Sequence, residues 1–191
     1  MDTNIFIFHG TEGYPEENWF PWLKQELEQK GYQVFIPQFP SPPIIPAKIA
    51  EWFDVLKNYK LSINEHSVLI GHSLGGIFAL RVLEKLDSPI KLAIFVGTPI
   101  GLQPILNFDR DNAFSGFNFN WEKIKSKSKN FVVFQSDNDP YVGLKNGTEL
   151  AKNLGVGLSL VPNAGHFNTK AKYLKFEELK EKILSLSNSL K

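Results

Sequence analysis

Six short hydrophobic runs recur along the chain, and none shows the strict alternation of polar and apolar residues that marks a half-exposed strand. Runs of this length without alternation are typical of strands covered on both faces, as in a parallel sheet. We therefore expect a strand at each of them. The runs occupy residues 5–8, 34–36, 68–70, 92–96, 131–134 and 158–161.

The segments between these runs carry apolar residues at helical spacing. Trp19, Leu23 and Leu27 follow one another at intervals of four, and Gly31 is placed to end that helix. Residues 144–154 also indicate a helix. Three further apolar stripes have this spacing, and the proline-rich residues 40–46 precede the first of them. They are formed by Ile49, Trp52, Phe53 and Leu56, by Leu74, Phe78, Val82 and Leu86, and by Leu174, Ile183, Leu186 and Leu190.

Strands that alternate with helices build right-handed βαβ units. The pattern therefore predicts an α/β fold, a three-layer α/β/α sandwich around a mainly parallel sheet of about six strands. We find no internal repeat and no linker, so residues 1–191 are expected to form a single domain. Residues 98–129 fit neither pattern, and we expect them to be irregular and to run over the sheet.

The composition is that of an ordinary globular protein, with 42% hydrophobic and 21% charged residues in a chain of 191. The net charge of +1 and the scattered basic residues give no reason to expect a nucleic-acid partner. The chain has no cysteine, which excludes disulfides, cysteine-ligated zinc and a cysteine nucleophile. No signal peptide or membrane-spanning run is visible, so a cytoplasmic protein with no membrane partner is expected.

One motif carries potential chemistry. The sequence GHSLG at residues 71–75 places Ser73 between two glycines, at the junction of the predicted strand 68–70 and the helix that follows. A nucleophilic serine needs such a sharp strand-to-helix turn, where a β-carbon at Gly71 or Gly75 would collide with neighbouring chain. The alternative is a serine that caps the helix, with glycines present for packing.

A serine nucleophile requires a base, and the chain has four histidines. His72 adjoins the serine and is expected to point away along the elbow, and His66 lies in a surface turn. His9 ends the first strand and is expected to brace the loop there. His166, in the loop after the last strand, remains as the candidate base, because loops at the carboxyl edge of a parallel sheet converge. The alternative is a solvent-exposed loop histidine.

The third group should be an acid that orients the histidine. Asp137 and Asp139 both follow the strand at residues 131–134. Pro140 biases Asp139 toward an extended conformation that projects its carboxylate out of the turn, whereas Asp137 can fold back on backbone N–H groups. We favour Asp139, and the chain order serine, acid, histidine is the one that an α/β-hydrolase requires.

An oxyanion site needs two N–H donors. The backbone N–H of Leu74 is one candidate, and that of Thr11, in the loop after the first strand, is the other. A substrate pocket is expected from His9 and from the aromatic residues of 98–129, although these aromatics are equally consistent with core residues. They are Phe108, Phe114, Phe117, Phe119 and Trp121.

With these residues in place, the chain resembles the α/β-hydrolase superfamily, and within it the compact serine hydrolase branch of YdeN-like and retinoblastoma-binding protein nine-like proteins. The resemblance runs nearly end to end. It implies a triad of Ser73, Asp139 and His166, no metal or other cofactor, and a site without a long helical lid. It rests on HG at 9–10, NWFPWL at 18–23, GHSLG at 71–75, SDNDP at 136–140 and AGHF at 164–167.

Residues and resemblance together predict a serine hydrolase that cleaves carboxylic esters of small molecules. A thioesterase or acyltransferase would use the same three groups and differ only in the leaving group or the acceptor. A binding protein with a vestigial site is the alternative outside enzymes. Amide cleavage is less favoured, because it needs stronger protonation of the leaving group.

Overall fold

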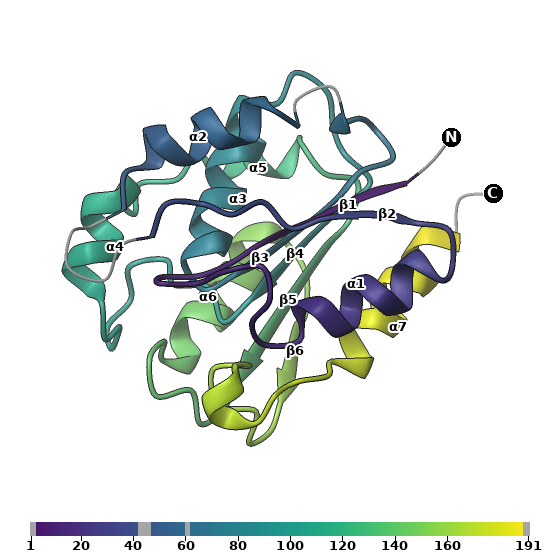
Figure 1. Cartoon of the computed structure of the whole chain (residues 1–191). Helices are drawn as coiled ribbons and strands as arrows, with labels where there is room; N and C mark the ends of the chain where they lie inside the picture. Colours follow the sequence, from purple (N-terminus) through teal and green to yellow (C-terminus); the bar gives the residue numbers. More distant parts are fainter. Residues whose placement is uncertain (1–2, 42–46, 60–61, 189–191) are drawn as a thin grey trace.

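The six hydrophobic runs form one parallel sheet, as the sequence predicted (Figure 1). This structure is a computed structural model that describes residues 3–41, 47–59 and 62–188. Every paired strand runs parallel to its neighbour, in the order β2-β1-β3-β4-β5-β6. The strands are β1 (Asn4–Phe8), β2 (Gln33–Phe35), β3 (Val68–His72), β4 (Leu92–Val96), β5 (Phe131–Ser136) and β6 (Leu158–Val161).

Helices cover both faces of this sheet, which confirms the predicted three-layer sandwich (Figure 1). Two helices pack on one face, α1 (Phe20–Glu28) and α7 (Glu177–Asn188). The other face is covered by α2 (Ile49–Lys57), α3 (Leu74–Lys85), α4 (Phe108–Ser115), α5 (Trp121–Lys125) and α6 (Leu144–Leu154).

Strand β1 shows why the hydrophobic runs are continuous. Phe6 and Phe8 enter the core under α2 and α3, whereas Ile5 and Ile7 enter the core under α1 and α7. Successive side chains of a strand point to opposite faces, so a strand covered on both sides is apolar at every position. All five residues of β1 are buried accordingly.

The order of the strands also locates the functional edge of the sheet. The chain passes from β1 outward to β2 and then returns to place β3 on the other side of β1. Ligands of open α/β sheets bind beyond the carboxyl ends of the strands at such a reversal. The loops that follow β1 and β3 are therefore expected to meet at a binding site.

The prediction that residues 98–129 are irregular is wrong in part, because this region contains α4 and α5. Only Phe108, Ala113 and Phe114 of α4 are apolar, and they give no clear stripe, while α5 is only five residues long. The C-terminal helix begins at Glu177, after Leu174. Leu190 and the proline-rich residues 42–46 lie outside the described residues. Within the described part of the chain, no helix has the length and apolar character needed to cross a membrane.

Candidate active site

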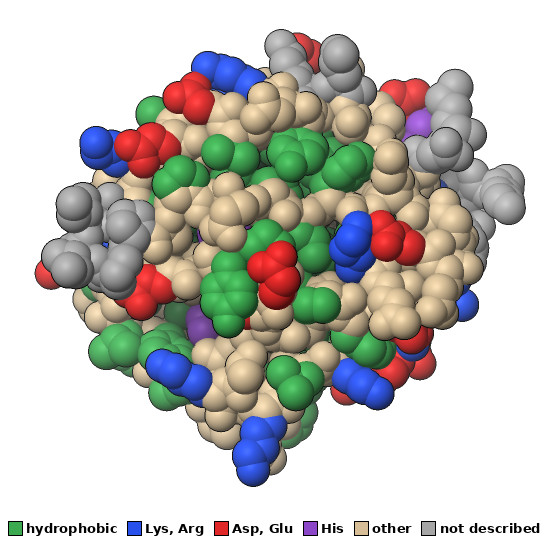
Figure 2. Space-filling view, in the orientation of Figure 1, with side chains coloured by type: hydrophobic (Ala, Val, Ile, Leu, Met, Phe, Trp, Pro, Cys, Tyr) green, Lys and Arg blue, Asp and Glu red, His purple; other side chains and the backbone are tan. Residues whose placement is uncertain are grey.

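A cleft of about 450 Å³ opens at the carboxyl edge of the sheet. It is lined from several loops, by Thr11 after β1, Ser73 after β3, Tyr141 after β5 and His166 after β6. Figure 2 shows a histidine side chain inside a hollow on the side of the molecule where the strands of Figure 1 end. Residues that are distant in the sequence therefore meet in one cavity, with a size suited to a small molecule.

Ser73 lies on a strained turn between β3 and α3. Its backbone has φ 55° and ψ −122°, a conformation that side-chain-bearing residues rarely adopt. The Ser73 N–H donates to the carbonyl oxygen of Val96 (2.9 Å), and the Ser73 carbonyl accepts from the Gly76 N–H (2.9 Å). Strain of this kind costs on the order of 1–3 kcal/mol and is typical of functional sites. The strand-to-helix turn predicted from the motif is confirmed.

The glycines that flank the serine are required by close packing. A β-carbon on Gly71 would lie 2.5 Å from the carbonyl oxygen of Gly75, and one on Gly75 would lie 2.1 Å from the carbonyl oxygen of Phe8. Both obstacles are backbone atoms, which side-chain rotation cannot move aside. The first turn of α3 therefore packs directly on the end of β1, as the motif predicted.

Replacing Gly75 with alanine is expected to destabilise the fold by about 3 kcal/mol or more, because overpacking against backbone forces the elbow away from β1. Urea unfolding, or soluble yield if the variant does not fold, would measure this. Gly157→Ala is the matched control, since that glycine is exposed and a β-carbon there meets nothing within 4 Å. Equal unfolding midpoints for the two variants would contradict the packing described here.

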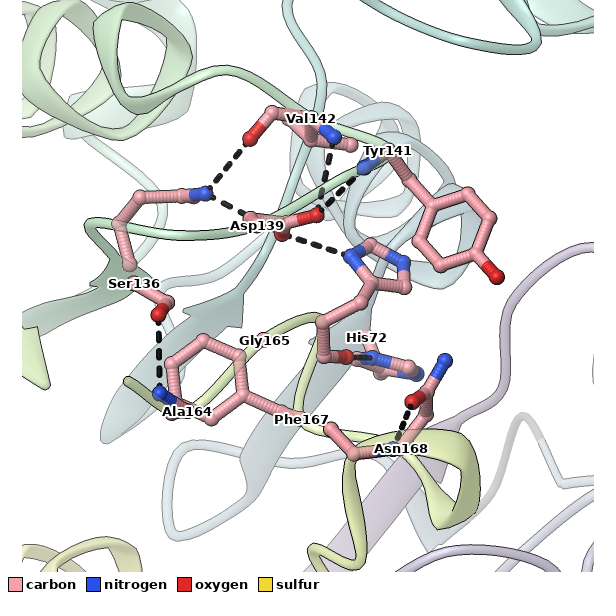
Figure 3. Close-up of polar contacts among 12 residues, drawn as sticks. His72, Ser136, Asp139, Tyr141, Val142, Ala164, Gly165, Phe167 and Asn168 are labelled. Atoms are coloured by element: carbon pink, nitrogen blue, oxygen red, sulfur yellow. Dashed lines mark hydrogen bonds and ion pairs between the residues drawn. The ribbon is translucent and has the colours of Figure 1, made fainter. Parts of the chain in front are cut away.

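His166 and Asp139 are in direct contact. The distance between His166 Nδ1 and Asp139 Oδ2 is 2.7 Å (Figure 3). The Asp139 side chain is fully buried and that of His166 is 8% exposed. A carboxylate at this position holds the proton on Nδ1, which leaves Nε2 free to accept a proton from another group.

The Asp139 carboxylate is itself held by N–H donors. Its Oδ1 accepts from the backbone N–H groups of Tyr141 (2.8 Å) and Val142 (3.0 Å), and its Oδ2 accepts from Gln135 Nε2 (3.3 Å) (Figure 3). Such donors fix the orientation of the carboxylate group. The physical reason predicted for choosing Asp139 is wrong, because Asp139 itself folds back on the backbone N–H groups of its own turn, the arrangement that was expected of Asp137.

Asp137 has a different place in the same turn. It is exposed, and its Oδ1 accepts the backbone N–H of Asn163 (2.8 Å). The residues on either side of Asp137 also accept backbone N–H groups of this loop. Ser136 Oγ accepts from the Ala164 N–H (3.0 Å), and Asn138 Oδ1 accepts from the Gly165 N–H (2.8 Å). Together these contacts fasten the turn after β5 to the loop that carries His166.

His72 is hydrogen-bonded to the backbone of the loop that carries His166. Its Nε2 lies 2.8 Å from the His166 carbonyl oxygen, to which it donates, and its Nδ1 has no hydrogen-bond partner among the described residues (Figure 3). Burial, with a smaller effect of His166, lowers the pKa of His72 to about 3. His72 is therefore neutral at physiological pH and fixes the backbone of His166.

The segment from Asn18 to Leu23 gives a second support that the residues alone did not reveal. Trp19 Nε1 donates to the Phe167 carbonyl oxygen (3.0 Å), and Asn18 Oδ1 accepts from the backbone N–H of Thr169 (2.8 Å). Both acceptor and donor belong to the loop just after His166. The aromatic segment singled out by the family resemblance thus anchors the histidine loop to α1.

The loop after β1 lies against the serine. A β-carbon on Gly10 would be 3.0 Å from the Ser73 β-carbon, so the two backbones approach closely. Thr11 lines the cleft, and Leu74 is the first residue of α3, where N–H groups have no partner within the helix. The loop that carries Thr11 and the first turn of α3 therefore both adjoin Ser73.

His9 does not line the cleft, so the expectation that it belongs to the substrate pocket is wrong. It is completely buried, its Nε2 accepts from the Phe39 N–H (2.9 Å), and its Nδ1 lies 3.0 Å from the Gly10 carbonyl oxygen. Since Nε2 accepts, Nδ1 carries the proton and donates. Burial lowers the pKa of His9, so it is a neutral brace between this loop and Phe39.

The four phenylalanines expected in the pocket are also placed elsewhere. Phe114 and Phe119 are buried in the core that α3 shares with the sheet, and Phe117 packs against that core. The rings of Phe108 and Phe117 are 5.4 Å apart. Phe114, Phe117 and Phe119 thus pack as the core alternative expects, whereas residues 105–107, 110 and 111 of this segment line the cleft.

Comparisons with known proteins agree with this architecture. A family model described as serine hydrolase matches residues 5–185. Over 167 residues the chain is 29% identical to YdeN of Bacillus subtilis (strain 168), with 87% of each protein covered. Over 171 residues it is 28% identical to the serine hydrolase RBBP9 of Rattus norvegicus, covering 88% of this chain and 86% of that protein.

Solved structures show the same fold. The crystal structure of the ydeN gene product from B. subtilis matches with a TM-score of 0.88 at 27% identity, covering 96% of this chain and 98% of that one. Est1E from Butyrivibrio proteoclasticus, at 15% identity, matches with a TM-score of 0.72, covering 97% and 88%. The resemblance inferred from the motifs is confirmed.

Proposed function

We propose that this chain, which belongs to the serine hydrolase family, cleaves carboxylic esters of small molecules with Ser73, His166 and Asp139. The observation that carries the proposal is the 2.7 Å contact between His166 Nδ1 and Asp139 Oδ2, in a cleft that Ser73 also lines. A buried carboxylate on one ring nitrogen and a strained serine in the same cleft are the elements that nucleophilic acyl transfer needs.

In the first half-reaction, Ser73 Oγ attacks the ester carbonyl carbon while His166 Nε2 takes the hydroxyl proton. The tetrahedral oxyanion accepts hydrogen bonds from the N–H groups of Leu74 and Thr11. His166 then gives its proton to the leaving alkoxide, which departs as the alcohol and leaves an acyl-serine. Asp139 stabilises the imidazolium that forms between these two proton transfers.

In the second half-reaction a water molecule replaces the alcohol. His166 Nε2 takes a proton from water as the oxygen attacks the acyl carbon, and it returns this proton to Ser73 Oγ as the acid leaves. The serine is thereby regenerated. No step requires a metal ion, because the protein groups named here carry out every proton transfer.

The chemistry is tested by comparing three acetyl compounds on the purified protein. We expect p-nitrophenyl acetate to be hydrolysed, p-nitroacetanilide to be hydrolysed at least about 100-fold more slowly, and an acetyl thioester of similar size to be no better than the oxygen ester. Values of kcat/KM decide the result. Turnover of the thioester alone would assign the site to thioester chemistry, and turnover of none of them would contradict the proposal.

A further inference from the structure

Asp111 is a buried acid in the same cleft as Ser73 and His166. It lies on α4, in the region that sequence reasoning expected to be irregular. The residue is only 4% exposed, although it lines the cavity. A carboxyl group that is nearly buried and yet lines a cleft is uncommon and calls for a physical reason.

The Asp111 carboxyl group has unmet hydrogen-bonding capacity. Its Oδ1 is buried and has no hydrogen-bond partner among the described residues. Burial raises the pKa of this carboxyl to about 7, although the charge of Arg110 acts in the opposite direction. Native proteins leave few buried polar atoms unpaired, because each one costs free energy in the folded state. Asp111 is thus a group that a ligand would satisfy.

Arg110, the cation next to Asp111 in the sequence, already forms an ion pair with another residue. Arg110 Nη1 lies 3.0 Å from Glu12 Oε1, so this guanidinium group is directed toward the rim of the cleft. Glu17 also lines the cleft, and burial raises its pKa to about 7 as well. The interior of the cleft thus offers two partly desolvated carboxyl groups, and both have acceptor oxygens.

Apolar side chains also line the cleft. Tyr14 and Leu106 are 50% and 66% exposed, respectively, whereas Ile105 and Val142 are buried. Phe114 and Phe119 of the same segment are part of the core, and Phe117 packs against it. An ester whose acid and alcohol parts carry only hydrocarbon groups would leave the Asp111 carboxyl unpaired inside the cleft. An ester that also carries a hydrogen-bond donor would form a hydrogen bond with this carboxyl.

We propose that Asp111 binds a hydrogen-bond-donating group, a hydroxyl or an ammonium, on the small ester that Ser73 attacks. The inference rests on the proposed function, since it names the class of substrate for that site. Recognition by a buried acceptor is selective, because an analogue without the donor leaves the acceptor desolvated and unpaired. The preferred substrate is therefore a polar ester.

Five esters of similar size test this inference, with hydrolysis followed by acid release at pH 7.5. Propyl butyrate has no donor. Propyl 3-hydroxybutyrate and propyl 3-aminobutyrate carry the donor on the acid, and 2-hydroxyethyl butyrate and 2-(dimethylamino)ethyl butyrate carry it on the alcohol. We expect at least one donor-bearing ester to exceed propyl butyrate in kcat/KM by about tenfold or more. Equal values for all five would overturn the inference.

Variants then tie the preference to this residue. Asp111→Leu should abolish the preference, so that the ratio of kcat/KM for the donor-bearing ester to kcat/KM for propyl butyrate falls to about one. Asp111→Asn retains an acceptor oxygen, so it should keep a hydroxyl preference but lose an ammonium preference. Asp109→Leu is the matched control, because Asp109 is exposed on the same helix. A preference that survives in Asp111→Leu would refute the assignment.

Thermal unfolding separates recognition from a structural role. If Asp111 is kept for binding, Asp111→Asn should raise Tm at pH 8, where the buried carboxyl is ionised, by about 2–4 °C or more. The sign follows from the raised pKa, because the folded state resists ionisation and loses stability as the pH rises from about 4 to 7. A lower Tm in this variant would show a structural role and contradict the inference.

Failure of the inference can be told apart from failure of the proposed function. A fluorophosphonate probe reacts with an activated serine whatever the natural substrate is. Labelling of Ser73 together with equal turnover of all five esters would retain the hydrolase and reject the role of Asp111. Absence of both labelling and ester turnover would reject the hydrolase itself and, with it, the recognition of any ester.

Discussion

Ser73→Ala and His166→Ala are each expected to lower kcat for ester hydrolysis on the order of 10⁴-fold or more. The first variant removes the attacking oxygen, and the second removes the group that takes its proton. Their effects should not add in the double variant, because the two side chains act as a unit. Purified variants assayed with p-nitrophenyl acetate would measure these losses.

Both variants should remain folded, so that the losses report on chemistry. Alanine at position 73 tolerates φ 55° about as poorly as serine does, and the backbone bonds of this residue to Val96 and Gly76 are retained. Equal Tm values for variant and wild type would confirm the control. Full activity in folded Ser73→Ala would mean that ester cleavage occurs elsewhere in the protein.

The second large effect is expected at Asp139. Asp139→Asn should lower kcat on the order of 10⁴-fold, because an amide facing Nδ1 favours the wrong tautomer and no longer stabilises the imidazolium. Asp137→Asn, two residues earlier, should change kcat by less than about threefold, since an asparagine oxygen can still accept the Asn163 N–H. The pair is matched in chemistry and in sequence position.

Steady-state kinetics on a single ester would compare these two variants. The difference should lie in kcat, because the carboxylate acts on the reacting groups and not on substrate binding. The reverse order, with Asp137→Asn the more damaging, would show that the acid had been assigned to the wrong residue. Comparable losses in both would point to general damage to the turn after β5.

The strands were predictable because each is covered on both faces. In β1 the side chains of Phe6 and Ile7 enter opposite cores, so the run is hydrophobic throughout and stands out from its surroundings. Helix α4 gave no such signal. Its buried residues are Asp111 and Phe114, and a helix that buries an acid cannot be recognised from an apolar stripe.

The groups around Ser73 were predictable for a topological reason. Parallel strands all end at one edge of the sheet, so residues just after β3, β5 and β6 converge whatever their separation in the chain. The 2.7 Å contact between Asp139 and His166 joins residues 27 positions apart. The sequence order of serine, acid and histidine therefore carried spatial information.

The lining of the cleft was not predictable from residue type. Phenylalanine is equally common in a protein core and in an acyl pocket. Which side chains of residues 98–129 face the core depends on helices that the sequence pattern did not reveal. Phe114 and Asp111 lie on the same short helix, yet only the acid lines the cleft. The hydrogen bond between Asn18 and Thr169, which supports the loop after His166, could not be predicted either, because the two residues are 151 positions apart in the sequence.

If Ser73 is an activated nucleophile, a fluorophosphonate probe should label the purified protein, because such probes react with activated serines whatever the natural substrate is. We expect wild type to be labelled at Ser73, as mass spectrometry of the modified peptide would show. Ser73→Ala and His166→Ala should not be labelled, whereas Asp137→Asn should be labelled as wild type is. No labelling of folded wild type, or labelling that persists in Ser73→Ala, would show that Ser73 is not the activated nucleophile.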